Sequence, residues 1–129
     1  MGLRQMNRII FENLSDAEID FLADGCGVSG TPLNAPDFLS TDSCNRHDVG
    51  YWIGGASEDR KAVDLEFYKN MRKDSHRLGG WWGRAYRALI ARTYYASVRI
   101  FAGFRFHYGT KRTLDDLAVA IEEDRNAKI

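Results

Sequence analysis

One short stretch of the sequence carries four side chains whose types and spacing could do chemistry. Cys44, His47, Asp48 and Tyr51 occupy positions i, i+3, i+4 and i+7. On a helix with about 3.6 residues per turn these positions share one face. A histidine with an ordinary pKa of about 6.5 can act as a general base at neutral pH. The stretch therefore indicates a catalytic or binding site on a helix, although a lone histidine would be more typical of a structural role.

A general base also needs a second carboxylate that fixes the orientation of its ring. Asp48 is poorly placed for this task, because consecutive helical residues point about 100° apart. A better orienting group is Asp64, which lies on the next expected helix in a stripe with the core-type residues Val63, Phe67 and Met71. We expect Asp64 to face His47, and the alternatives are partial exposure or pairing with an arginine.

Helical patterns that must position these residues run through nearly the whole chain. The 129 residues, with 44% hydrophobic and 28% charged side chains, predict a single all-α domain covering residues 1–129. The expected helices are one capped by Ser15 with Glu18 and ending near Asp24-Gly25, one capped by Asp42 or Thr41 and running to about Ile53, one capped by Ser57 and reaching about Asp74, one that follows Gly79-Gly80 and ends at Gly103, and one from about Thr113.

The connections suggest how the site is held together. Only a few residues separate the second and third helices, so these two should form an antiparallel hairpin. Residues 24–41 contain several glycines and prolines and should form a loop. The alternating segment from Phe104 to Tyr108 could make a short extended piece.

The loop that precedes the His47 helix offers ligands for a hard cation. Asp24 supplies a carboxylate, and the glycines beside it free backbone carbonyls to turn inward. The only two cysteines, Cys26 and Cys44, permit one disulfide, which would bring Asp24 close to Asp48. Two buried thiols are the alternative. Two cysteines and one histidine in this spacing lack a fourth ligand for zinc.

These motifs together resemble the phospholipase A2 superfamily, and most closely its prokaryotic and fungal branch. The branch pattern Cys-x-Arg-His-Asp-Phe-Gly-Tyr is matched from Cys44 to Tyr51, with Val49 in place of phenylalanine. The similarity covers about residues 20–103. It extends to the loop at Asp24-Gly25-Cys26, to the later helix with Asp64, Phe67 and Met71, and to the segment 94–103.

The resemblance implies a small helical domain built on two antiparallel helices, with a calcium loop before them and further helices packed around. It implies calcium-dependent hydrolysis of the sn-2 acyl ester of glycerophospholipids. The implied roles are His47 as the base, Asp64 as its orienting group and Tyr51 in support, with Ca²⁺ held by Asp24, Asp48 and the Gly25 carbonyl and a disulfide between Cys26 and Cys44.

The charge distribution bears on the partner. The net charge is zero, but residues 60–112 carry 13 lysines and arginines against three acids. This favours an anionic partner, either a phospholipid surface or nucleic acid, or else simply exposed bases. The resemblance implies the phospholipid surface and no nucleic acid. Trp81 and Trp82, with Arg77 and Arg84 nearby, suit either a membrane interface or a core.

Two further expectations concern alternatives. The chain shows neither a long apolar segment nor a signal peptide, so it should be exported by another route, be the mature part of a precursor, or be intracellular. A non-catalytic phospholipase-like binding or structural protein, phage- or toxin-associated, is the alternative to an enzyme.

Overall fold

The protein is all-α, as the sequence predicted. The structure, a computed structural model, describes residues 7–23, 36, 38–77 and 81–128, with the backbone alone at Trp81 and Trp82. Within these ranges there are five α-helices and two short 3-10 turns. They are η1 (Phe11–Asn13), α2 (Asp16–Leu22), α3 (Thr41–Ile53), α4 (Ser57–His76), α5 (Trp81–Phe101), η2 (Gly103–Arg105) and α6 (Leu114–Ala127).

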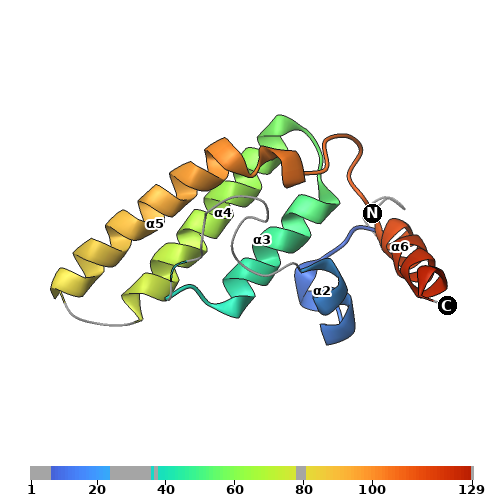
Figure 1. Ribbon diagram of the computed structural model, residues 1–129, viewed down its shortest axis with the longest axis horizontal. Coiled ribbons are helices and arrows are strands. Elements are labelled where there is room, and N and C mark those ends of the chain that lie inside the picture. Colours follow the sequence, from blue (N-terminus) through green and yellow to red (C-terminus); the bar gives the residue numbers. More distant parts are fainter. Residues whose placement is uncertain (1–6, 24–35, 37, 78–80, 129) are drawn as a thin grey trace.

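Three long helices form the body of the molecule. Figure 1 shows α3, α4 and α5 side by side, each running antiparallel to the one before it. Helix α4 packs against both α3 and α5, and α2 packs against α3. The short connection between α3 and α4 therefore gives the expected antiparallel hairpin. No helix in the described ranges is long and apolar enough to cross a membrane.

The starts of the helices agree with the sequence in part. At α2 the predicted capping box is present, with Ser15 and Glu18 each accepting from the other's backbone N–H. At α3, however, the cap is Ser40, whose hydroxyl accepts from the Ser43 N–H. The expected caps Thr41 and Asp42 instead lie within the first turn. Ser57 is also not a cap but the first residue of α4.

The ends of the helices differ from expectation by two or three residues at most. Helix α2 ends at Leu22, α4 continues to His76, and α5 ends at Phe101 because residues 103–105 tighten into the 3-10 turn η2. The predicted extended piece is thus limited to the residues after η2. There, the N–H of His107 donates to the Tyr51 carbonyl at 3.2 Å and ties this segment to the end of α3.

A glycine makes this junction possible. Gly54 ends α3 with a φ of +78°, a backbone conformation that favours glycine. A Cβ at this position would also collide with the His107 carbonyl oxygen. The Gly55 N–H donates to that same oxygen at 2.9 Å, so the segment after η2 lies directly against the α3–α4 turn.

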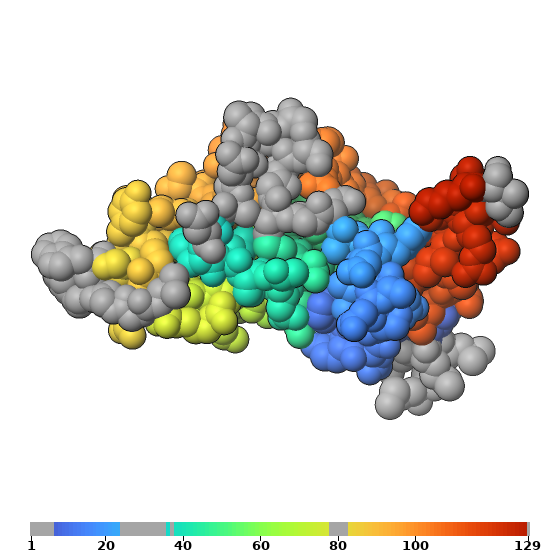
Figure 2. Space-filling model, turned by 60° about the horizontal axis from the view of Figure 1, so that its bottom comes forward, coloured from blue at the N-terminus to red at the C-terminus, as the bar shows by residue number. Residues whose placement is uncertain are grey.

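Helix α3 is buried on two sides by two apolar clusters. The first cluster lies between α3, α4 and α5, and the second packs the opposite side of α3 against the N-terminal residues and α6. In Figure 2 the blue N-terminal residues lie between α3 and the red α6. The first cluster contains Tyr51, Phe67, Met71, Ala91, Tyr94, Val98, Ala102 and Phe106, and the second contains Ile9, Leu22, Val49 and Leu117.

Close approach of α3 and α4 depends on a missing side chain. A Cβ built on Gly50 would lie 2.7 Å from a methyl carbon of Val63, which is closer than such atoms pack. Glycine at this position therefore lets the two backbones come together one turn after His47. This brings the His47 side chain within reach of α4.

Candidate active site

The centre of the candidate site is a fully buried carboxylate. Asp64 on α4 has 0% exposure, and burying an ion is costly unless it is paired and hydrogen-bonded. Its Oδ1 lies 2.8 Å from His47 Nε2 on α3 and accepts a 2.7 Å hydrogen bond from the Tyr51 hydroxyl. Three residues selected from the sequence therefore meet at one oxygen atom.

Two arginines occupy the other side of the Asp64 carboxylate. Arg99 on α5 donates from Nη1 to Oδ2 at 2.7 Å, and Arg60 Nε lies 3.7 Å from the same oxygen. Arg60 also donates to the Tyr51 hydroxyl at 3.2 Å. Its Nη2 donates to the carbonyls of Val98 and Arg99, each at 2.9 Å. Arg60 therefore fastens the C-terminal end of α5 to the site.

The His47 ring is held by aromatic neighbours. It stacks on Phe67, with ring centroids 4.2 Å apart and planes inclined by 21°, and it contacts Tyr51 at 4.4 Å. The side chain is 11% exposed. A cavity of about 240 Å³ between α3 and α4 has His47, Val63 and Phe67 in its wall. The ring is thus fixed in position and still borders open space.

The environment sets the protonation of the three groups. Burial pushes the pKa of Asp64 up, but hydrogen bonds from His47, Tyr51 and Arg99 outweigh it and hold this pKa below its ordinary value. Burial lowers the pKa of His47, although the Asp64 carboxylate acts in the opposite direction. Burial and the hydrogen bond to Asp64 raise the pKa of Tyr51. At neutral pH the ring is therefore neutral and donates from Nε2 to ionised Asp64, which leaves Nδ1 as the proton acceptor.

Asp48 follows His47 on α3 and is half-buried. Its predicted companions in a calcium site, Asp24 and Gly25, lie outside the described residues. Within the described ranges no group of three or more histidine, cysteine, aspartate or glutamate side chains is arranged to hold a metal ion. Cys44 is buried near the start of α3, and its predicted partner Cys26 also lies outside the described residues.

Comparison with known proteins decides the family. A sequence model described as "Prokaryotic phospholipase A2" matches residues 3–102, which is most of the chain. This chain belongs to the prokaryotic phospholipase A2 family. Membership confirms the family expected from the sequence.

A curated relative supports the same family. The chain is 35% identical over 95 residues to "Secretory phospholipase A2" of Beauveria bassiana (strain ARSEF 2860), a match that covers 67% of this chain. The matched part spans 45% of the length of that relative. No solved structure matches the chain.

The one departure from the phospholipase A2 motif lies away from the site. Val49, which stands where the branch has phenylalanine, is 2% exposed and packs with Leu22 and Leu117 in the second cluster. It therefore contacts the N-terminal segment and α6, not His47. The substitution leaves the chemical face of α3 unchanged.

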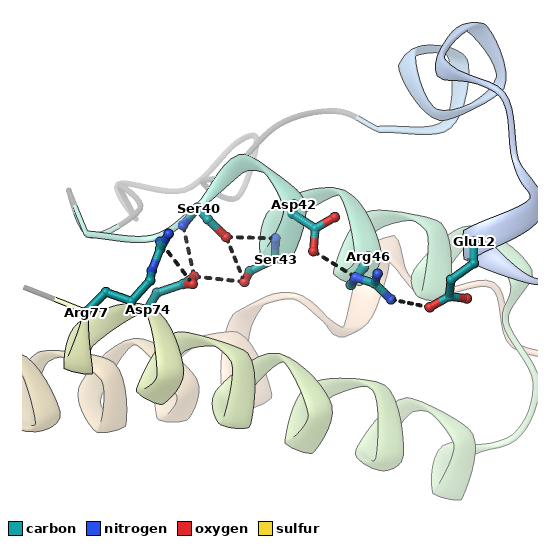
Figure 3. Close-up of polar contacts among 7 residues, drawn as sticks. All are labelled: Glu12, Ser40, Asp42, Ser43, Arg46, Asp74 and Arg77. Carbon is teal, nitrogen blue, oxygen red and sulfur yellow. Dashed lines mark hydrogen bonds and ion pairs between the residues drawn. The ribbon is translucent and has the colours of Figure 1, made fainter.

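A second buried carboxylate fixes the N-terminal end of α3. Asp74, near the end of α4, accepts from the Ser40 N–H at 2.9 Å and from the Ser43 hydroxyl at 2.8 Å (Figure 3). Arg77 lies 3.2 Å from its other oxygen. Sequence analysis did not single out this cluster. The capping pattern at Ser40 was the available signal, but three neighbouring residues suit a cap equally well.

Arg46, the arginine of the phospholipase A2 motif, has a structural role. It forms ion pairs at 2.8 Å with Asp42, four residues earlier on α3, and with Glu12 in η1 (Figure 3). Its guanidinium also lies over the Phe11 ring, 4.4 Å from the centroid. The motif arginine therefore joins η1 to α3.

The other two histidines lie outside this arrangement. His76 is exposed at the end of α4, and His107 Nε2 lies 3.1 Å from the Thr110 carbonyl. Arg60 and Arg99 are the site residues that sequence reasoning missed. The open alternative of an arginine partner for Asp64 pointed to their type. Arg60 stands four residues before Asp64, but nothing in the spacing identified Arg99.

Proposed function

We propose that this protein hydrolyses the sn-2 acyl ester of glycerophospholipids in a calcium-dependent reaction. The observation that carries the proposal is the shared oxygen of Asp64, which engages His47 Nε2 and the Tyr51 hydroxyl within a member of the phospholipase A2 family. The hydrogen bond to Nε2 directs the basic Nδ1 atom to the reaction.

His47 acts on water in this proposal. Nδ1 accepts a proton from the water as the water oxygen attacks the ester carbonyl carbon. When the intermediate collapses, the bond to the glycerol oxygen breaks and His47 returns the proton to that oxygen. The products are a fatty acid and a lysophospholipid. Asp64 stabilises the charged imidazole and Tyr51 holds Asp64 in place, so neither needs to contact the substrate.

The donors available for a metal fit calcium. Asp48 and Asp24 supply carboxylate oxygens and Gly25 supplies a backbone carbonyl, all of them hard ligands of the kind that Ca²⁺ takes. When bound, Ca²⁺ supplies positive charge for the substrate phosphate and for the developing oxyanion. We assign Asp48 to the metal because Asp64 already engages Nε2 of the neighbouring histidine.

A disulfide between Cys26 and Cys44 is part of the same proposal. Cys44 is buried on α3, three residues before His47, and the described part of the chain contains no free cysteine. The bond would tie the predicted calcium loop to the helix that carries Asp48. It would also close a loop of the size for which a disulfide contributes about 3 kcal/mol.

The proposed partner is the surface of a phospholipid aggregate rather than nucleic acid. Three arginines of the basic section are engaged inside the protein, since Arg60 and Arg99 bind near Asp64 and Arg87 donates to the Ser75 carbonyl. The basic section therefore offers fewer free cations than its composition suggests, which weakens the nucleic-acid interpretation.

The test is release of fatty acid from a short-chain phosphatidylglycerol kept below its micellar concentration. Release that requires Ca²⁺ and stops with EGTA is the expected result for the folded wild-type protein. We expect His47→Asn to lower kcat about 10³-fold, because it removes the general base. His76→Asn, on an exposed histidine, is the matched control and should behave as wild type. Folded wild-type protein that releases no fatty acid with Ca²⁺ would contradict the proposal.

A further inference from the structure

Helix α5 is apolar on two opposite sides. One side packs into the first cluster through Ala91, Tyr94 and Val98. On a helix whose other side faces water, polar residues are expected there. Instead, Tyr86, Leu89 and Ile100 are 66%, 62% and 72% exposed.

The exposed apolar residues of α5 form a continuous row. Tyr86, Leu89, Thr93, Ala96 and Ile100 recur at alternating spacings of three and four, which places them on one face over about 21 Å. We name this set the α5 stripe. Thr93 and Ala96 are exposed as well, and the Thr93 hydroxyl already donates to the Leu89 carbonyl at 2.9 Å. The stripe therefore offers water very few polar groups.

Two further apolar residues that follow Ile100 in the sequence are also exposed. Phe101 and Phe104, in the last turn of α5 and in η2, are 50% and 69% exposed. Aromatic rings at such positions suit the boundary between water and lipid, where one edge is apolar and the other wet. Exposed apolar rows of this extent are uncommon on monomeric soluble proteins and mark interaction surfaces.

The charges on α5 indicate what covers the stripe. The helix contains four arginines and not a single aspartate or glutamate. Arg87 and Arg99 bind groups inside the protein. Of the two exposed arginines, Arg92 flanks the α5 stripe, whereas Arg84 lies about 160° around the helix from it. A partner helix would normally be met by charges of both signs. An amphipathic helix whose charges are all positive matches an anionic lipid surface.

We infer that the α5 stripe is the surface with which this protein docks, in plane, on anionic phospholipid bilayers. The inference rests on the proposed function for its purpose, since docking brings the enzyme to its substrate. The docking helix also contacts the site directly: Arg99 binds Asp64 at 2.7 Å and Arg60 holds the last carbonyls of α5. The stripe and the site are therefore parts of one rigid unit.

Binding is measured without turnover, by sedimentation with sucrose-loaded vesicles in EGTA. We expect wild-type protein to bind vesicles of pure phosphatidylglycerol at least about tenfold more tightly than phosphatidylcholine, and less tightly as salt increases. The double variant Leu89→Asp, Ile100→Asp should lose at least about tenfold in affinity. Both side chains are largely exposed, so folding should be retained.

A matched control comes from α6. Val119 is 56% exposed on a helix rich in acids, and Val119→Asp should bind as wild type does. Arg92→Glu changes charge alone and should weaken binding to phosphatidylglycerol while reducing its salt dependence. Wild-type affinity in both the Leu89→Asp, Ile100→Asp double variant and Arg92→Glu, or equal loss in the α6 control, would overturn the inference. So would a wild-type dimer that the stripe substitutions dissociate and that binds no vesicles.

The same proteins separate this inference from the proposed function. With the dispersed short-chain substrate, stripe variants should keep wild-type kcat and KM because docking is not needed. With vesicles, their rate should fall in parallel with binding. If the proposed function is wrong, the protein does not hydrolyse dispersed substrate but still binds vesicles through the α5 stripe. If the docking inference is wrong, dispersed substrate is hydrolysed but the stripe substitutions do not weaken vesicle binding.

Discussion

Asp64 and Asp74 are two aspartates of the same helix that have different roles. Both lie on α4, both are nearly inaccessible, at 0% and 8% exposure, and both accept hydrogen bonds from α3. Asp64 is hydrogen-bonded to a histidine and a tyrosine side chain. Asp74 accepts instead from the Ser40 backbone N–H and the Ser43 hydroxyl at the start of α3.

The cations beside the two carboxylates differ as well. Asp64 has Arg99 and the buried Arg60, while Asp74 has Arg77, whose side chain is 65% exposed. Burial and residue type therefore do not distinguish a site from a structural clamp. What distinguishes the two is the hydrogen-bonding partner, which is the titratable ring of His47 at Asp64 and a backbone N–H and a hydroxyl at Asp74.

The sharpest test of this comparison is Asp64→Asn. We expect kcat to fall about 10²- to 10³-fold, because the ring loses the group that fixes its tautomer and stabilises its charged form. The free energy of unfolding should also fall by about 3 kcal/mol, since two arginines lose their counterion. Initial rates on dispersed substrate and chemical unfolding measure these two effects. Near-wild-type kcat in Asp64→Asn would remove the distinction between the two carboxylates.

The matched variant is Asp74→Asn. It should lower the free energy of unfolding by about 1–3 kcal/mol, because the Ser40 N–H or the Ser43 hydroxyl loses a charged acceptor. At temperatures where it is folded, its kcat should stay close to that of wild type. Unfolding curves and rates on the same samples give both quantities. A large loss of kcat in folded Asp74→Asn would show that the clamp also serves the chemistry.

The smallest expected effect concerns pH. Burial holds the pKa of His47 below its ordinary value, so the acidic limb of kcat/KM at saturating Ca²⁺ should lie below about pH 6.5. The Asp64 carboxylate acts to raise this pKa, so the residual activity of Asp64→Asn should show its acidic limb at still lower pH. Asp74→Asn should leave the limb in place. If the acidic limb moved in Asp74→Asn and not in Asp64→Asn, Asp74 rather than Asp64 would be the carboxylate that influences the pKa of His47.

Local patterns were enough to predict most of the fold. Periodicity, glycines and caps gave the helices to within a few residues, because each of these signals acts over one or two turns. The cap of α3 was assigned wrongly because Ser40, Thr41 and Asp42 all suit that position. What selects Ser40 is Asp74, which binds its N–H from 34 residues away.

The same limit applies to the site. His47, Asp48 and Tyr51 stand in one motif, and Asp64 stood out as a carboxylate in a core stripe. Arg99 could not be found in this way, because it is 35 residues from Asp64 and reaches it only through the packing of α5 on α4. Contacts across helices depend on how the helices cross, which spacing along the chain does not encode.

The packing of Val49 bears on which parts of the structure can change without affecting the site. It sits two residues after His47, yet its neighbours are Ile9, Leu22 and Leu117 from the two ends of the described chain. Leu117 lies beyond the segment shared with the family, which stops at residue 102. The side of α3 that faces away from His47 is thus covered in part by α6, outside the family segment, so a change in that covering need not alter the face that carries His47.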